Sequence, residues 1–213
     1  MTEFIPFPKM ARLSREVIVT EKIDGTNASI YIFEMQDDMI PPCALDLFTI
    51  DGKVHCMMAG SRTRWLGRDA DNHGFGQWAM DHRKELQGLG PGRHFGEWWG
   101  CGIQRGYGLK EKRFSLFNAI RWCRHDEEPE LLPTADPRVV KHQERAPSCC
   151  HIVPVIHRSS VFSTRDVDDA LIELETKGSL AAPGFMRPEG VVVFHIAGNV
   201  GFKKTFDDGH KGT

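Results

Sequence analysis

The sequence predicts a domain of the α+β class, because short strand-like segments outnumber helical ones and the two kinds do not alternate regularly. The chain has 213 residues, of which 40% are apolar and 26% are charged. This composition is typical of soluble globular domains and not of fibrous or disordered chains. A chain of this length buries a core of its own, so we expect a single domain over residues 1–213.

The first part of the chain predicts three strands and a helix. Residues 17–20, 28–33 and 54–59 are rich in β-branched and apolar residues, which favour strands. A polar stretch that contains Gly25 separates the first two strands. Residues 74–89 carry apolar side chains at steps of three and four, which predicts a helix.

The second part predicts further strands and one more helix. Residues 94–99 and 113–122 read as strands joined by the glycine-rich stretch 100–108. Ser163 is a typical helix N-cap, and Gly178 is a typical end for the helix that follows it. The remaining expected elements are a surface insertion around 126–147, a short edge strand at 152–156, and closing strands at 191–195 and 200–203.

Composition narrows the functional classes. The 6 cysteines form no CxxC pair, so a zinc ribbon is not expected, and we interpret them as reduced thiols. The sequence shows neither a signal peptide nor an apolar run of membrane-spanning length. We therefore expect a cytoplasmic protein with no membrane partner. The net charge is only −2, so nucleic acid would have to bind at a local basic groove.

Lys22 stands out by its position in the chain. It lies within the segment 21–27, which separates the strands expected at 17–20 and 28–33. Short polar side chains and a glycine between two buried strands are typical of places where a fold holds reactive groups. A lysine amine becomes a useful nucleophile when burial or a neighbouring cation lowers its pKa. Lys22 is therefore a candidate nucleophile.

The segment Glu-Lys-Ile-Asp-Gly-Thr-Asn at 21–27 resembles motif I of the covalent nucleotidyltransferases, which include ATP-dependent ligases and mRNA capping enzymes. It is similar in particular to RNA ligases of the RNA ligase 2 type, which are well represented in bacteriophages. Further segments resemble the later motifs in the same order, and the resemblance spans residues 4–206. They are Ser61-Arg62-Thr63 for motif Ia, Phe95-Gly96-Glu97 for motif III, Arg113 to Phe117 for motif IIIa, Pro188 to Val192 for motif IV, and Phe202-Lys203-Lys204 for motif V.

The resemblance implies a fold and a reaction. The fold is the ATP-grasp-like adenylation domain of DNA and RNA ligases, with antiparallel sheets flanked by helices. In the reaction, Lys22 attacks ATP to form a lysyl-AMP, the AMP passes to a 5′-phosphate, and a 3′-hydroxyl displaces it. The implied cofactors are ATP and Mg²⁺ (or Mn²⁺), because attack at the α-phosphorus requires the triphosphate charge to be neutralised.

The matched motifs also imply roles for individual residues. Glu189, at the start of a strand, would hold the metal directly or through water. Glu97 lies among aromatic residues, where a carboxylate is costly unless it has a partner. Phe117 would stack on a purine. The resemblance assigns catalysis to Lys22, Asp24, Lys203 and Lys204, and nucleotide binding to Glu21, Ile23, Asn27, Arg62, Glu97, Phe117 and Glu189.

Two features depart from the family's pattern. The family usually separates its motif V lysines by one residue, whereas Lys203 and Lys204 are adjacent. Because side chains alternate faces along a strand, both can face the nucleotide only across a bulge; otherwise one lysine serves the phosphates. The chain also stops 8 residues after Thr205, so we expect a stand-alone domain with no C-terminal OB-fold. A basic cluster would then supply phosphate contacts: Arg62, Arg64, Arg105, Lys110, Lys112 and Arg113.

The expected partner besides ATP is nucleic acid, either RNA ends or a nicked duplex, with an RNA/DNA hybrid also open. We expect a monomer, which would work in the host cytoplasm if the chain is phage-encoded. Two other interpretations stay open. One is a DNA ligase or a GTP-using capping-type transferase. The other is a relative that binds nucleotide or RNA without joining ends, which the adjacent motif V lysines favour.

Overall fold

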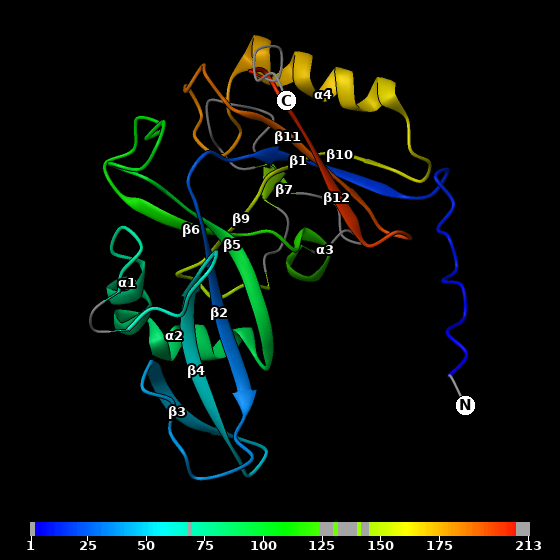
Figure 1. The fold of residues 1–213 in the computed structure, drawn as a ribbon. Coiled ribbons are helices and arrows are strands. Elements are labelled where there is room, and N and C mark those ends of the chain that lie inside the picture. Colours follow the sequence, from blue (N-terminus) through cyan, green and yellow to red (C-terminus); the bar gives the residue numbers. More distant parts are fainter. Residues whose placement is uncertain (1–2, 68–69, 124–129, 132–139, 142–144, 208–213) are drawn as a thin grey trace.

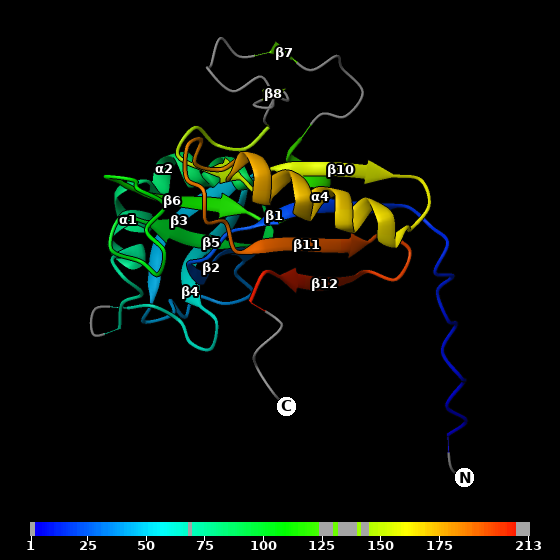
Figure 2. The ribbon, with the colours of Figure 1, turned by 90° about the horizontal axis from the view of Figure 1, so that it is seen from above.

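The computed structural model describes residues 3–67, 70–123, 130–131, 140–141 and 145–207. The described chain forms a four-stranded sheet, a six-stranded sheet and a small two-stranded sheet. Helices pack on both main sheets (Figures 1 and 2). This arrangement confirms the α+β class and the antiparallel sheets flanked by helices that the sequence predicts.

The four-stranded sheet carries the first strand of the chain and the last ones. Its order is β10–β1–β11–β12, and all its pairings are antiparallel. Helix α4 covers one face, where Val17 and Val19 share an apolar core with Leu174. Because strand side chains alternate between faces, Lys22 lies on the face that α4 does not cover. The elements are β1 (Val17–Lys22), β10 (Val155–Ser159), α4 (Thr164–Lys177), β11 (Gly190–His195) and β12 (Val200–Thr205).

The six-stranded sheet has the order β3–β4–β2–β5–β6–β9, and only the pairing of β6 with β9 is parallel. Its apolar core joins Ile30 and Trp98 of the sheet to Phe75 and Leu86 of the helices. Its strands are β2 (Thr26–Glu34), β3 (Ala44–Ile50), β4 (Lys53–Ser61), β5 (Gly92–Gly100), β6 (Lys112–Leu116) and β9 (His151–Ile152). The other elements are α1 (Phe75–Asp81), α2 (Arg83–Leu86), η1 (Gln87–Leu89), α3 (Ala119–Trp122), and the paired strands β7 (Glu130–Leu131) and β8 (Val140–Lys141).

The chain passes from one main sheet to the other between Lys22 and Thr26, as the blue ribbon of Figure 1 shows. Ile23, in this crossing, is buried in a third apolar cluster with Trp99 of β5. We call this the junction cluster; its buried members are Ile23, Trp99, Tyr107, Val153 and Ala182. The segment that resembles motif I therefore lies where the two main sheets meet.

The helix predicted after Ser163 is confirmed, whereas the one predicted at 74–89 is not a single continuous helix. Helix α4 begins after Ser163, whose Oγ accepts a hydrogen bond from the Arg165 N–H at 3.2 Å, and it ends before Gly178 as predicted. The single helix predicted at 74–89 is divided into α1, α2 and η1. The break falls at His82, whose φ of −98° and ψ of 11° leave helical geometry.

The strand predictions also need corrections. The strand predicted at 113–122 ends at Leu116, because Asn118 caps α3 with its side chain. The segment 152–156 is divided between β9 and β10, in different sheets, around Pro154, which has no N–H to donate. Strand β3 was not predicted, since it follows a proline-rich loop. The insertion expected at 126–147 lies largely outside the described residues. Among those described, no helix has the length and apolar character needed to cross a bilayer.

Candidate active site

The side chain of Lys22 points toward Glu189. Lys22 ends β1 and pairs with Gly190, which begins β11, so the residue before Gly190 lies beside it. The Lys22 Nζ is 2.5 Å from the Glu189 Oε2, and the two side chains are 23% and 17% exposed. An ammonium has no lone pair with which to attack. Lys22 must therefore leave this ion pair and lose a proton before it can act as a nucleophile.

Two glycines permit close approach of the chain on either side of Lys22. A Cβ at Gly25 would lie 2.5 Å from the carbonyl oxygen of Trp98 and 2.7 Å from the Cβ of Trp99. Gly190 has a φ of +149°, and a Cβ there would collide with the carbonyl oxygen of Lys204. Only glycine fits such positions without a shift of the backbone. The motif I segment therefore rests directly on β5, and the start of β11 rests on β12.

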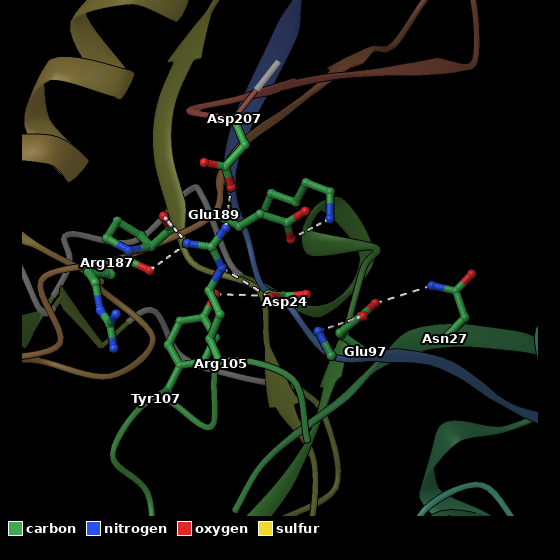
Figure 3. Close-up of polar contacts among 11 residues, drawn as sticks. Asp24, Asn27, Glu97, Arg105, Tyr107, Arg187, Glu189 and Asp207 are labelled. Carbon is green, nitrogen blue, oxygen red and sulfur yellow. Dashed lines mark hydrogen bonds and ion pairs between the residues drawn. The ribbon is translucent and has the colours of Figure 1, made fainter. Parts of the chain in front are cut away.

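Glu97 is a buried carboxylate that fixes the motif I segment. Its Oε1 accepts a hydrogen bond from the Gly25 N–H and its Oε2 accepts one from the Asn27 side-chain amide, both at 3.1 Å (Figure 3). Glu97 is 8% exposed. Burial raises the pKa of Glu97 to about 7, although the Asn27 hydrogen bond and the Lys22 charge oppose the shift. The protonation of this carboxyl group therefore changes near neutral pH.

Arg105 joins three segments around the site, as Figure 3 shows. Its Nε donates to Asp24 Oδ2 at 3.0 Å, and its Nη2 donates to Asp207 Oδ2 at 2.7 Å. Its Nη1 donates to the carbonyl oxygen of Arg187 at 3.2 Å, two residues before Glu189. One guanidinium thus connects the motif I segment, the entry to β11 and the chain after β12.

The loop at 100–108 that carries Arg105 has an unusual backbone. Gln104 and Tyr107 have positive φ angles of 45° and 51°, which are uncommon for residues other than glycine. The Tyr107 hydroxyl accepts a hydrogen bond from the Asp24 N–H at 2.9 Å. Such conformations persist where surrounding contacts hold them, and Tyr107 and Arg105 of this loop both contact Asp24.

Comparison with known proteins places the chain in a family. A family model described as RNA ligase matches residues 15–204. The chain belongs to the RNA ligase family. The matched range includes Lys22, Glu97, Arg105 and Glu189, whose geometry is described above.

Solved RNA ligases have a similar fold. Two structures of Naegleria gruberi RNA ligase mutants, each with ATP and Mn, match this chain with TM-scores of 0.54 and 0.53. The first is 17% identical and covers 92% of this chain and 51% of that one; the second is 18% identical and covers 90% and 49%. The chain therefore spans about half the length of those proteins. No curated protein sequence matches it.

The adjacent lysines of β12 lie on opposite faces of the four-stranded sheet. The pairing of β12 with β11 is regular along its whole length, without a bulge. Lys203 lies opposite Val192, which places it on the face of Lys22. Lys204 lies on the α4 face, where its Nζ is 2.5 Å from Asp168 Oδ1. The strand therefore presents one lysine to the site, as the alternation of side chains requires.

Two of the residues implied for nucleotide binding have side chains turned into the protein. The Glu21 carboxylate is 1% exposed and accepts hydrogen bonds from the Ser179 hydroxyl at 2.6 Å and the Leu180 N–H at 2.8 Å. Ile23 is 3% exposed in the junction cluster. Both side chains therefore pack inside the protein next to Lys22, and their role in nucleotide binding stays a prediction.

Phe117 and Arg62 are both exposed. Phe117 directly follows β6, two residues after Ser115, which pairs with Glu97. Its ring is 42% exposed, so it is available for stacking on a base. Arg62 is exposed in the turn after β4, and no ion pair of Arg62 occurs within the described ranges.

Three members of the basic cluster have partners within the described chain. Arg105 is held by two carboxylates, Arg113 pairs with Glu111 at 2.6 Å, and Lys112 donates to the carbonyl oxygen of His73. Phosphate contacts by this cluster stay a prediction. Sequence reasoning also did not single out Tyr107 or Asp207. The concentration of glycines at 100–108 was the only local signal for that part of the site.

Proposed function

We propose that the chain is an ATP-dependent RNA ligase that joins a 3′-hydroxyl to a 5′-phosphate through a lysyl-AMP intermediate. The placement of Lys22 Nζ 2.5 Å from Glu189 Oε2, in a member of the RNA ligase family, carries this proposal. The similar ligase structures contain ATP and Mn, which supports ATP and a divalent metal as cofactors. The two sheets and their junction support an ATP-grasp-like adenylation domain.

In the first step, Lys22 attacks the α-phosphorus of ATP with the lone pair of Nζ. A phosphorus–nitrogen bond forms, the bond to the bridging oxygen breaks, and pyrophosphate leaves. Lys203, an exposed side chain on the face of Lys22, contributes a positive charge near the phosphates. A positive charge aimed at the phosphates stabilises the charge that develops in the transition state.

Glu189 is the residue that would hold the divalent metal. The described residues contain no group of three or more His, Cys, Asp or Glu side chains suited to a metal. Mg²⁺ at phosphate-transfer sites is usually held by one or two carboxylates together with substrate phosphates and water. Glu189 fits that pattern once Lys22 is released. When bound, Mg²⁺ or Mn²⁺ supplies charge that neutralises the phosphates.

The later steps use the motif I segment. The AMP passes from Nζ to the 5′-phosphate of an RNA strand, and the phosphorus–nitrogen bond breaks. A 3′-hydroxyl then attacks the activated phosphate, a phosphodiester forms, and AMP leaves. Asp24, held by Arg105, and Asn27, held by Glu97, flank this segment. We assign them to orienting the phosphate groups, because fixed geometry lowers such barriers.

Covalent labelling tests the proposal. We expect incubation with ATP labelled at the α-phosphate and with Mg²⁺ to mark the protein, and Lys22→Ala to abolish the mark. The control is Lys53→Ala, since Lys53 is 62% exposed and pairs with Glu34 at the protein surface. If Lys22→Ala labels as well as the wild type, Lys22 is not the nucleophile.

Substrate panels separate the remaining candidates. ATP and GTP in competition distinguish a ligase from a capping-type transferase, and sealing of RNA, DNA and hybrid nicks identifies the strand. A relative that transfers AMP without joining ends is a second candidate, because Lys204 is engaged with Asp168. AMP transfer without sealing across the whole panel would favour it. Within the leading proposal, the enzyme is a phage-like ligase that acts as a monomer in the cytoplasm.

A further inference from the structure

An arginine and three aromatic rings form a cluster on the six-stranded sheet outside the site. The Arg93 Cζ lies 4.7 Å from the ring centroid of Tyr31, 5.1 Å from that of Trp65 and 6.0 Å from that of Phe95. The Tyr31 and Trp65 rings stack with an interplanar angle of 16°. We call these four residues the arginine–aromatic surface.

This surface continues directly from the candidate active site. Strands β2 and β5 pair Asn27 with Glu97 in the site, and Tyr31 with Arg93 in the arginine–aromatic surface. Phe95 lies between Glu97 and Arg93 on the same face of β5, because side chains two residues apart share a face. Two residues of a strand span about 7 Å, so Phe95 is one such step from the carboxylate that holds Asn27.

The arginine–aromatic surface is open, and its arginine has no carboxylate partner among the described residues. Phe95 is 53% exposed and Trp65 is 37% exposed, and Arg93 is exposed as well. In the part of the chain that the structure describes, Arg93 makes contacts with rings but no ion pair. Exposed Arg62 precedes Trp65 by three residues.

We propose that the arginine–aromatic surface binds unpaired bases of the substrate RNA next to the end that reacts. Aromatic rings and arginine planes are the groups on which single-stranded bases stack, while arginine charge neutralises the phosphates. The inference rests on the proposed function, because it places the strand beside Lys22. It also narrows the substrate class to RNA ends with unpaired nucleotides.

Physical chemistry favours an unpaired strand over the other occupants. A perfect duplex keeps its bases stacked inside and offers mainly phosphates and 2′-hydroxyls. The rings of Phe95 and Trp65 would then have no base on which to stack. A protein partner would be expected to bring a carboxylate for Arg93, and nothing ties such a partner to the strands of the site. An unpaired RNA strand accounts for the exposed rings, for the charge of Arg93 and for the position of this surface next to the candidate active site.

The test compares binding of a single-stranded, 5′-phosphorylated RNA with binding of a blunt duplex of the same length. Fluorescence anisotropy at fixed salt measures both, and covalent labelling by ATP reports separately on nucleotide transfer. We expect Phe95→Ala to weaken single-strand binding about tenfold or more, as the loss of one stacked base does. We expect Arg93→Lys, which keeps the charge and removes the plane, to weaken it as well. Phe7→Ala is the control, since Phe7 is 82% exposed on the N-terminal segment.

Unchanged single-strand affinity in both variants overturns the inference, and so does an equal loss of duplex and single-strand binding. Either result leaves the proposed ligase intact if Lys22 is still labelled, whereas a wild type that takes no label overturns the proposed function instead. If Phe95→Ala does not fold, quenching by RNA of the fluorescence of Trp65 decides the question. The Trp65 contribution is obtained by subtracting the fluorescence of the Trp65→Phe variant from that of the wild type. If RNA does not quench this contribution, the inference is overturned.

Discussion

At the scale of single residues, Glu97 links the stability of the site to pH. Its carboxylate reaches from β5 to the motif I segment and receives two amide hydrogen bonds from it. These donors do not fully offset the loss of water around the charge, and burial raises its pKa to about 7. The protein therefore tolerates a carboxylate that is costly to ionise, because that carboxylate positions Gly25 and Asn27.

We expect the free energy of unfolding to fall as pH rises from 4.5 to about 7. The pKa of Glu97 is about 7 in the folded protein against 4.5 for the free group, so the folded protein keeps a proton that the unfolded chain releases. The full shift corresponds to about 3 kcal/mol. Glu97→Gln should remove this part of the pH dependence in urea unfolding at pH 5 and pH 8. Glu175→Gln on the exposed face of α4 is the control, and an unchanged slope in Glu97→Gln would contradict the assignment.

Arg105 is a second residue whose effect can be tested. We expect Arg105→Ala to slow the sealing of a pre-adenylated RNA roughly tenfold to a hundredfold, because Asp24 loses the cation that positions it. Single-turnover sealing is the measurement. The control is Arg158→Ala, whose arginine pairs with Glu16 at 2.6 Å in the other sheet. Normal sealing by a folded Arg105→Ala protein would show that Asp24 needs no such support.

The limits of sequence reasoning at this scale follow from distance along the chain. Lys22, Asp24, Glu97 and Glu189 each lie in a short motif, so local patterns point to them. Arg105 acts through Asp24 and Asp207, which are 81 and 102 residues away. A local sequence pattern contains no information about such distant contacts. Arg105 was therefore predicted to belong to a basic surface cluster.

At the scale of elements, the register of β12 decides which motif V lysine can serve the site. We expect Lys203→Ala to slow formation of the lysyl-AMP about a hundredfold, the size of effect seen when one preorganised charge or donor is removed. Lys204→Ala should change that rate little. It removes an ion pair whose side chains are 53% and 55% exposed, and such pairs contribute at most about 1 kcal/mol. Rapid-quench labelling measures both rates, and equal losses would mean that β12 does not hold this register in solution.

Element boundaries were predictable where the chain carries its own signal. Ser163 and Gly178 mark α4 because capping is a local interaction. The end of β6 was missed because apolar residues continue past Leu116, and only the cap at Asn118 turns the chain into α3. The alternation of side chains correctly predicted that Lys203 and Lys204 lie on opposite faces of a regular strand, because this alternation depends on strand geometry alone. Which lysine faces the site required the pairing with β11.

At the scale of the whole molecule, the junction cluster couples the two main sheets. Tyr107 contributes its ring to this cluster and its hydroxyl to the Asp24 N–H. We expect Tyr107→Phe to lower the free energy of unfolding by about 1–3 kcal/mol, because it leaves that N–H without its acceptor. The chain has 2 tyrosines, and Tyr31→Phe, on the open face of the sheet, is the matched control. Equal urea midpoints for the two variants would contradict the coupling.

The strand order β10–β1–β11–β12 has a consequence for synthesis on the ribosome. Most strands of the six-stranded sheet have been synthesised once β6 is translated. Strand β1 pairs with β11 only later, because Thr20 contacts Val192, which is translated 172 residues after it. Once β10 has been made, the nascent chain carries Lys22, the proposed nucleophile, on a strand whose other edge stays unpaired until β11 emerges, and such an edge is prone to aggregation. A product truncated before Gly190 would contain Lys22 but lack both β11 and β12, so we expect it to form no lysyl-AMP.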